Sequence, residues 1–337
     1  MKTTWIAAFA ATTILTVPVS ASTLSETFTS YYAFGDSLTD DGKLPDFALH
    51  EVSDDGRFSN GPTWAEHIAD LFTGTGANTA NLAIGGATGD DENFSPINAL
   101  STFAGQVATF TASVLTGAPL PVRTSLTDVV IPQATNPGSN PLVSVLFGGN
   151  DMFQSEARAA ANMTTVQEVL EDAADAVADN IRDIAALDGG NTFDDFLVLT
   201  LPGGGPADIY NAQLGLNLLD LQAEGLNIIS FDTDAVFNEI VEDALLNGGG
   251  EFGVTQVFPP CTASLNEPGN PSCLDLGLDP NTIALVDPVH PNAVVHSVLG
   301  ERVIAAVEAS VVPLPASLPL LLAGLAGFGL LRRRPSA

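Results

Sequence analysis

Basic side chains are scarce in this sequence, which carries 10 lysines and arginines against 40 aspartates and glutamates. Four of the basic residues, Lys2, Arg332, Arg333 and Arg334, lie in the end segments considered below. A surface this acidic repels nucleic acid and anionic lipid, so neither is an expected partner. The charge also favours solubility in salty surroundings, and it describes the environment of the protein more than its activity.

Histidine and cysteine are also scarce, with four histidines and two cysteines in 337 residues. The histidines are scattered and lack the clustered spacing of a metal-ligand set. Paired acids such as Asp40 and Asp41 could hold calcium, but they lack the alternating carboxylates and glycine of an EF-hand loop. A solvated acidic surface is the favoured interpretation, and we expect no metal and no cofactor.

The two cysteines, Cys261 and Cys273, are separated by a short loop and lie far along the chain from the candidate nucleophile described below. This distance disfavours thiol catalysis. In an exported chain two such thiols most simply form one disulfide. Closing a loop of this size would stabilise the fold by ~3 kcal/mol.

Long apolar runs occur only near the ends of the chain. Residues 1–21 begin with Lys2, continue through a mostly apolar run at 5–19 and close with small residues at 19–21. This order is typical of a secretory signal peptide, which we place at 1–21. A buried first helix is the alternative, and the lack of a polar face with helical period disfavours it.

The C-terminal segment, 312–337, consists of the motif VPLPA at 312–316, an apolar run at 317–331 and three arginines. The run is shorter than the ~20 residues of a full membrane span, and Pro319 interrupts it. The arrangement resembles the VPLPA-type sorting tails of Gram-negative bacteria, which are handled by exosortase-like proteases. The resemblance implies cleavage of the tail after export and a secreted or cell-surface location.

The remaining residues, 22–311, predict a single domain in which strands and helices alternate. Such alternation predicts a parallel sheet with helices on both faces, which binds ligands outside the carboxyl ends of its strands. A capping box at Thr165 and Glu168 starts the clearest amphipathic helix. The expected strands are 30–34, 79–84, 142–147, 196–201 and 226–231, and the expected helices are 166–184, 212–224, 235–246 and 292–309.

The densest chemical signal follows the first expected strand, where Ser37 stands two residues after Gly35. A serine at a tight glycine turn is exposed to substrate, but it needs a base because a free hydroxyl is a weak nucleophile. The alternative is that Ser37 caps the start of a helix. The sequence therefore predicts a nucleophile only if a base can be found.

Among the histidines, only His290 has a carboxylate at a spacing that suits a loop-held catalytic pair. Asp287 stands three residues before it, and two prolines restrict the backbone of this segment. The acid could fix the imidazole tautomer and stabilise the imidazolium that forms when Ser37 loses its proton. We interpret His67, which follows Trp64 in an amphipathic stretch, and His296, which falls in the expected closing helix, as structural.

Acyl transfer also needs hydrogen-bond donors for the developing oxyanion. Gly86, after the second expected strand, offers a backbone N–H with no side chain to obstruct it. Asn150, after the third, offers a side-chain amide. Each signal is weak alone, because glycine-ended strands are common and asparagine often caps a turn or helix.

Taken together, the four blocks resemble the GDSL or SGNH hydrolase family, and the resemblance spans residues 31–299. The resemblance implies a flavodoxin-like three-layer α/β/α fold with a central parallel sheet and a nucleophile at Ser37. It also implies an oxyanion hole made by the Ser37 N–H, Gly86 and Asn150, with Gly86 preferred over Gly85 by register. The blocks follow one order along the chain: Ser37, Gly86, Asn150, and Asp287 with His290.

The expected activity is hydrolysis of a small-molecule or lipid carboxylic ester through an acyl-enzyme. An acyltransferase using the same intermediate and a catalytically silent surface or matrix protein remain as alternatives. Residues 57–64 resemble the lipase-like and acylhydrolase branches, and Phe58 and Trp64 within them could line an acyl pocket. Aromatic residues near a helix are more often core, so we leave both out of the site.

Overall fold

The computed structural model describes residues 23–44, 49, 51–116, 120–123, 128–131, 137–187, 192–262 and 271–311. The expected signal peptide at 1–21 and the sorting tail at 312–337 lie outside the described residues. In the part of the chain that is described, no helix has the length and apolar character needed to cross a membrane.

The core of the fold is a five-stranded parallel sheet, as the alternation of strands and helices predicts. Its strand order is β2-β1-β5-β6-β7, which is 2-1-3-4-5 when the strands of this sheet are counted along the chain. This is the flavodoxin-like order, and it confirms the predicted fold class. The strands are β1 (Ser30–Gly35), β2 (Asn78–Asn81), β5 (Pro141–Leu146), β6 (Asp195–Leu199) and β7 (Asn227–Phe231).

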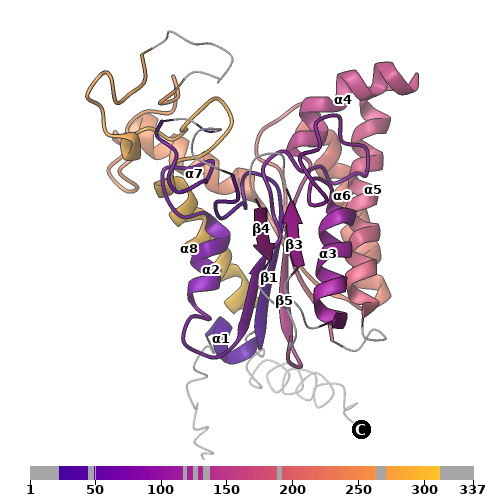
Figure 1. Cartoon of the computed structure of the whole chain (residues 1–337). Coiled ribbons are helices and arrows are strands. Elements are labelled where there is room, and N and C mark those ends of the chain that lie inside the picture. The colour runs from indigo at the N-terminus through magenta and orange to yellow at the C-terminus, as the bar shows by residue number, and fades with distance from the viewer. Residues whose placement is uncertain are drawn as a thin grey trace, which may run out of the picture.

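Helices cover both faces of this sheet and complete three layers (Figure 1). On one face lie α2 (Trp64–Asp70), α8 (Ala293–Val311) and the neighbouring α7 (Thr233–Asn247). On the other face lie α3 (Phe103–Thr116), α4 (Gly149–Asn162), α5 (Val166–Ala185) and α6 (Pro206–Glu224). The remaining elements are α1 (Leu24–Thr27), the short helix η3 (Pro280–Thr282) and a hairpin of β3 (Leu120–Arg123) and β4 (Asp128–Ile131).

The neighbouring interior strands β1 and β5 are buried along their whole length, which explains their nearly continuous apolar sequences. Their register pairs Phe34 with Val145 and Gly35 with Leu146, so both strands end at the same edge of the sheet. Aromatic rings pack beneath that edge, with Phe34 and Phe110 edge to face at 5.3 Å between ring centres. The apolar core therefore holds the segments that follow β1 and β5 in fixed positions.

The predicted helix at 166–184 is observed as α5, and its capping box is present, with the Glu168 N–H donating to Thr165 Oγ1. The second strand is shorter than predicted and ends at Asn81. Beyond it the N–H groups of Leu82 and Ile84 still donate to the carbonyls of Ala33 and Gly35, while the Ala83 N–H is engaged by the side chain of Asn81 at 2.9 Å. The expected disulfide between Cys261 and Cys273 is present.

Candidate active site

A tight turn after β1 presents Ser37 at the carboxyl end of the sheet. The carbonyl of Asp36 accepts the N–H groups of Thr39 and Asp40, each at 3.0 Å, and its carboxylate accepts the Leu38 N–H at 3.0 Å. No helix begins within residues 38–44, so the alternative that Ser37 caps a helix is wrong.

Only glycine fits immediately before this turn. A Cβ at Gly35 would lie 2.7 Å from Thr39 Oγ1 and 2.9 Å from the carbonyl oxygen of Leu146. Any larger residue would force the turn away from β5. The motif therefore has a steric reason for its glycine, independent of the chemistry of Ser37.

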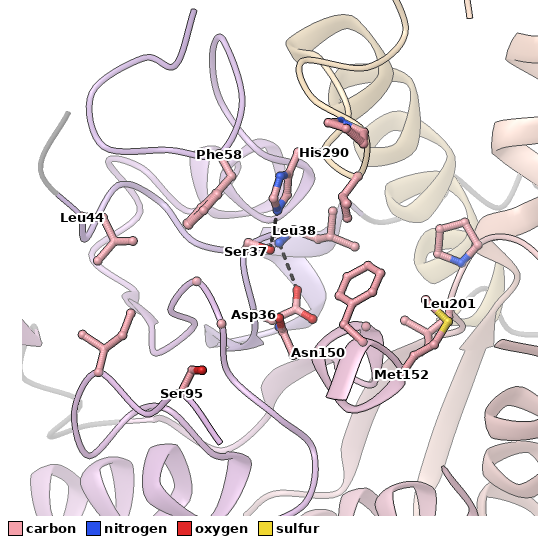
Figure 2. Close-up of a pocket in the computed structure, with 18 residues that line it drawn as sticks. Asp36, Ser37, Leu38, Leu44, Phe58, Ser95, Asn150, Met152, Leu201 and His290 are labelled. Atoms are coloured by element: carbon pink, nitrogen blue, oxygen red, sulfur yellow. Dashed lines mark hydrogen bonds between the residues drawn. The ribbon is translucent and has the colours of Figure 1, made fainter. Parts of the chain in front are cut away.

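The loop before α8 brings His290 and Asp287 to Ser37. One oxygen of Asp287 accepts the N–H groups of Val289 and His290, both at 2.8 Å, so the three-residue spacing closes into a turn. The other oxygen lies 2.7 Å from His290 Nδ1, and His290 Nε2 lies 2.8 Å from Ser37 Oγ. Figure 2 shows the imidazole of His290 pointing at Ser37. A continuous hydrogen-bonded chain thus joins carboxylate, imidazole and hydroxyl.

Three hydrogen-bond donors face the same pocket as Ser37. Among the hydrogen bonds of the described residues, the N–H groups of Ser37 and Gly86 have no acceptor. Asn150 Nδ2 donates one hydrogen to the carbonyl of Ala87 at 2.9 Å, which leaves its second hydrogen for another acceptor. The N–H of Gly85 is engaged by Asp40 Oδ2 at 2.9 Å, so Gly86 is the available donor of the two glycines.

Around this group lies a pocket of about 750 Å³. Apolar side chains form most of its wall, and Ser95 is the only polar side chain among its lining residues that lies outside the reaction centre and Asp36 (Figure 2). The apolar lining includes Leu44, Phe58, Ile97, Met152, Phe153 and Leu201.

Phe58 belongs to this wall, so the prediction that leaves it out of the site is wrong. Its ring centre lies 4.8 Å from that of His290. The sequence showed only an aromatic residue before a helix, and the contact depends on how the segment folds back over Gly85. Trp64 is fully buried in the core, as expected for its position in α2.

Two buried ionisable groups lie near the reaction centre without joining its hydrogen-bonded chain. Burial raises the pKa of Asp36 to about 7, although the Leu38 N–H and His290 oppose this shift. Burial lowers the pKa of His296 to about 3, and the nearby His290 and His67 lower it further. His296 Nδ1 accepts the Trp64 N–H at 3.4 Å, so its contact is with the core. His67 lies in α2, and His50 is outside the described residues.

Within the described ranges, no three histidine, cysteine, aspartate or glutamate side chains are grouped to hold a metal ion. The reaction centre consists of the serine, the imidazole, the carboxylate and the surrounding N–H donors.

Comparison with solved structures finds proteins of similar fold at low sequence identity. Acetylxylan esterase Axe2 from Geobacillus stearothermophilus aligns with a TM-score of 0.41 and 14% identity over 82% of this chain and 96% of its own. LAE5, an alpha/beta hydrolase enzyme from the metagenome of Lake Arreo, Spain, aligns with a TM-score of 0.41 and 12% identity over 82% of this chain and 94% of its own. A search of curated proteins finds no match.

The sequence itself matches the GDSL-like Lipase/Acylhydrolase family over residues 31–303, which is most of the chain. This range includes both the turn that carries Ser37 and the loop that carries His290. The chain belongs to the GDSL-like lipase/acylhydrolase family and is a carboxylic ester hydrolase.

Proposed function

We propose that this protein cleaves carboxylic esters through an acyl-enzyme formed on Ser37. One observation carries the proposal: His290 lies 2.8 Å from Ser37 Oγ through one ring nitrogen and 2.7 Å from Asp287 through the other. A hydroxyl, a base and an orienting acid in this order form the minimum set for nucleophilic acyl transfer.

In the proposed mechanism, Ser37 Oγ attacks the ester carbonyl carbon while His290 Nε2 takes the hydroxyl proton. Asp287 stabilises the imidazolium that results. The carbonyl oxygen becomes an oxyanion, which the donors of Ser37, Gly86 and Asn150 stabilise. The intermediate then collapses, the bond to the alcohol oxygen breaks, and His290 returns the proton to the leaving alcohol.

Deacylation repeats these steps with water. His290 accepts a proton from water as its oxygen attacks the acyl carbon, and it returns a proton to Ser37 Oγ as the acid leaves. An alcohol in place of water would give acyl transfer. Product analysis with added alcohol distinguishes these two outcomes, and hydrolysis is the one we expect.

The pocket supports an ester with an apolar acyl group as the substrate. Its volume of about 750 Å³ exceeds the needs of an acetyl group, and its wall is largely apolar. Burying each additional CH₂ contributes about 0.8 kcal/mol, or roughly fourfold in binding. We therefore expect kcat/KM to rise with acyl chain length until the chain fills the pocket.

We also propose that the protein is exported and loses its tail. The signal-like segment 1–21 and the VPLPA segment 312–337 support this proposal. A disulfide between Cys261 and Cys273 is compatible with an oxidising compartment. The experiment is to recover the protein from the native host outside the cytoplasm and to measure its mass. We expect the mass of a chain that lacks both end segments.

The activity is tested with p-nitrophenyl esters from acetate to laurate, comparing wild type with Ser37→Ala and Ser95→Ala. Ser95 lines the same pocket, which makes it a matched serine control. We expect Ser37→Ala to lose at least about 10³-fold in kcat and Ser95→Ala to stay near wild type. Equal turnover by Ser37→Ala would contradict the proposal, and a folded wild type without turnover of any ester would favour the silent surface protein.

A further inference from the structure

The loop of residues 85–90, which carries the Gly86 N–H, is held at its start by a buried carboxylate. Asp40 is fully buried, and its Oδ2 accepts the Gly85 N–H at 2.9 Å. Its Oδ1 accepts the N–H groups of Gly42 and Lys43, both at 3.1 Å. Asp40 therefore links this loop to the segment that follows Ser37.

A second buried carboxylate holds the end of the same loop. Asp151 is also fully buried, and its Oδ2 accepts the Gly89 N–H at 2.7 Å. Its Oδ1 accepts the Asp90 N–H at 3.2 Å and a hydrogen bond from Arg158 Nη1 at 3.0 Å. Asp151 therefore links the loop to the first turn of α4.

The placement of the two carboxylates along the chain connects them to the oxyanion donors. Asp40 stands three residues after Ser37, and Asp151 immediately follows Asn150. Each carboxylate thus comes from a segment that supplies one donor, and it binds the loop that supplies the third. Together they fasten the three donor segments to one another.

Each carboxylate has a buried cation beside it. Lys43 Nζ lies 3.6 Å from Asp40 Oδ1, and only 8% of Lys43 is exposed. Arg158 is 1% exposed, and besides Asp151 it pairs with Asp90. Burying a charge is costly unless it is paired and hydrogen-bonded. Paired carboxylates that accept several N–H groups hold backbone more tightly than neutral acceptors do.

We propose that Asp40 and Asp151 are positioning residues that fix the Gly86 N–H relative to Ser37 and Asn150. The inference rests on the proposed function, in which Gly86 stabilises the oxyanion. An oxyanion donor is worth about 10²- to 10³-fold in kcat, and a misplacement of 1 Å can cost about 10²-fold. Neither carboxylate is among the residues that line the pocket, so their effect is exerted through the loop.

Asp151→Asn is the first test, because it preserves volume while removing the charge and one acceptor. We expect kcat for a p-nitrophenyl ester to fall about 10- to 100-fold, with KM changed less than about threefold. Affinity for an alkyl boronic acid, whose serine adduct mimics the tetrahedral intermediate, should fall in proportion to kcat/KM. Asp40→Asn should show the same pattern.

Asp243→Asn is the matched control. Asp243 is also buried and accepts two backbone N–H groups, from Glu251 at 3.0 Å and Phe252 at 3.1 Å, but it does not line the pocket. We expect kcat and boronate affinity of this variant to stay within about twofold of wild type, whatever its change in melting temperature.

The proposal is overturned if folded Asp151→Asn and Asp40→Asn keep wild-type kcat and boronate affinity, or lose activity only through KM. Loss of folding in both variants would also overturn it, because a general role in stability would then suffice. Failure of the proposed function appears elsewhere, in wild-type protein that neither turns over esters nor binds the boronic acid.

Discussion

Replacing Asp287 by asparagine should harm catalysis more than replacing it by alanine. One oxygen of Asp287 accepts two backbone N–H groups at 2.8 Å each, and the other lies 2.7 Å from His290 Nδ1. In Asp287→Asn the backbone donors require the amide oxygen at the first position, so the NH₂ group must face His290. An NH₂ group there donates to Nδ1 and leaves the ring proton on Nε2, facing Ser37.

The magnitude follows from the hydrogen bonds at stake. To act as a base, His290 in Asp287→Asn must move its proton to Nδ1, against the NH₂ group. In that state the Nδ1–H and the NH₂ group point at each other, and leaving these two donors unsatisfied costs about 1–3 kcal/mol each. Losing the carboxylate also removes a charged hydrogen bond worth about 1.5–3 kcal/mol. The lower ends of these ranges together give about 3.5 kcal/mol, so at 1.36 kcal/mol per tenfold we expect kcat to fall by at least about 400-fold.

Asp287→Ala loses the charged hydrogen bond to His290 and the two backbone hydrogen bonds of the turn, but no NH₂ group opposes the active tautomer, so the imidazole can still carry its proton on Nδ1. The expected loss in kcat is then about 10- to 100-fold. The assay is steady-state hydrolysis of one p-nitrophenyl ester by both variants, with melting temperatures measured to confirm folding. Activity of Asp287→Asn equal to or above that of Asp287→Ala would refute the tautomer argument.

Three further predictions concern stability. The pKa of His296 is lower in the folded protein than in the unfolded chain, so between about pH 7 and pH 5 only the unfolded chain takes up this proton. Wild type should therefore lose about 2 kcal/mol of unfolding free energy over this range, and urea titrations of His296→Leu should show a smaller loss. The pKa of Asp36 is raised from the ordinary 3.8 to about 7, so the folded protein loses stability relative to the unfolded chain as Asp36 ionises. The unfolding free energy of Asp36→Asn should therefore rise relative to that of wild type between about pH 4 and pH 8, by at most roughly 4 kcal/mol. A difference that shrinks as pH rises would contradict this. Replacing Cys261 and Cys273 by alanine should lower the unfolding free energy by ~3 kcal/mol, and an unchanged denaturation midpoint would contradict this.

The two halves of the reaction centre could be predicted from the sequence because each carries a local signal, and the family resemblance brings Ser37 and His290 together although they are 253 residues apart. Asp287 and His290 are three residues apart, and the turn between them closes on hydrogen bonds within that short segment. Gly35 is needed before Ser37 for a steric reason. The sequence indicates a tight turn there because the expected strand ends in this glycine. The parallel sheet could be expected from the alternation of strands and helices, and its flavodoxin-like arrangement from the family resemblance.

The supports of the site could not be predicted in the same way. The hydrogen bond from Gly85 to Asp40 joins residues 45 apart, and that from Gly89 to Asp151 joins residues 62 apart. Such contacts depend on the assembled sheet and have no local pattern. For the same reason the sequence did not place Phe58 against His290.

Some helices were missed because their sequences carry weak local signals. Helix α4 starts at Gly149, a residue of poor helix propensity, and its N-cap Gly148 has a left-handed φ of 111°. Helix α3 contains Gly105 and several β-branched residues, and its formation depends on packing Phe103 and Phe110 against the sheet. Helices α3 and α4 therefore depend on packing against the rest of the fold more than on their local sequence.

The nucleophile is tested most directly by covalent labelling with an alkyl fluorophosphonate, followed by mass mapping of peptides. The purified wild type should carry one phosphonyl group, located on Ser37, and lose ester turnover in step with labelling. Ser37→Ala should remain unlabelled, and Ser95→Ala should label like wild type. A phosphonyl group on another residue, or turnover that survives complete labelling of Ser37, would contradict the assignment of Ser37 as the nucleophile.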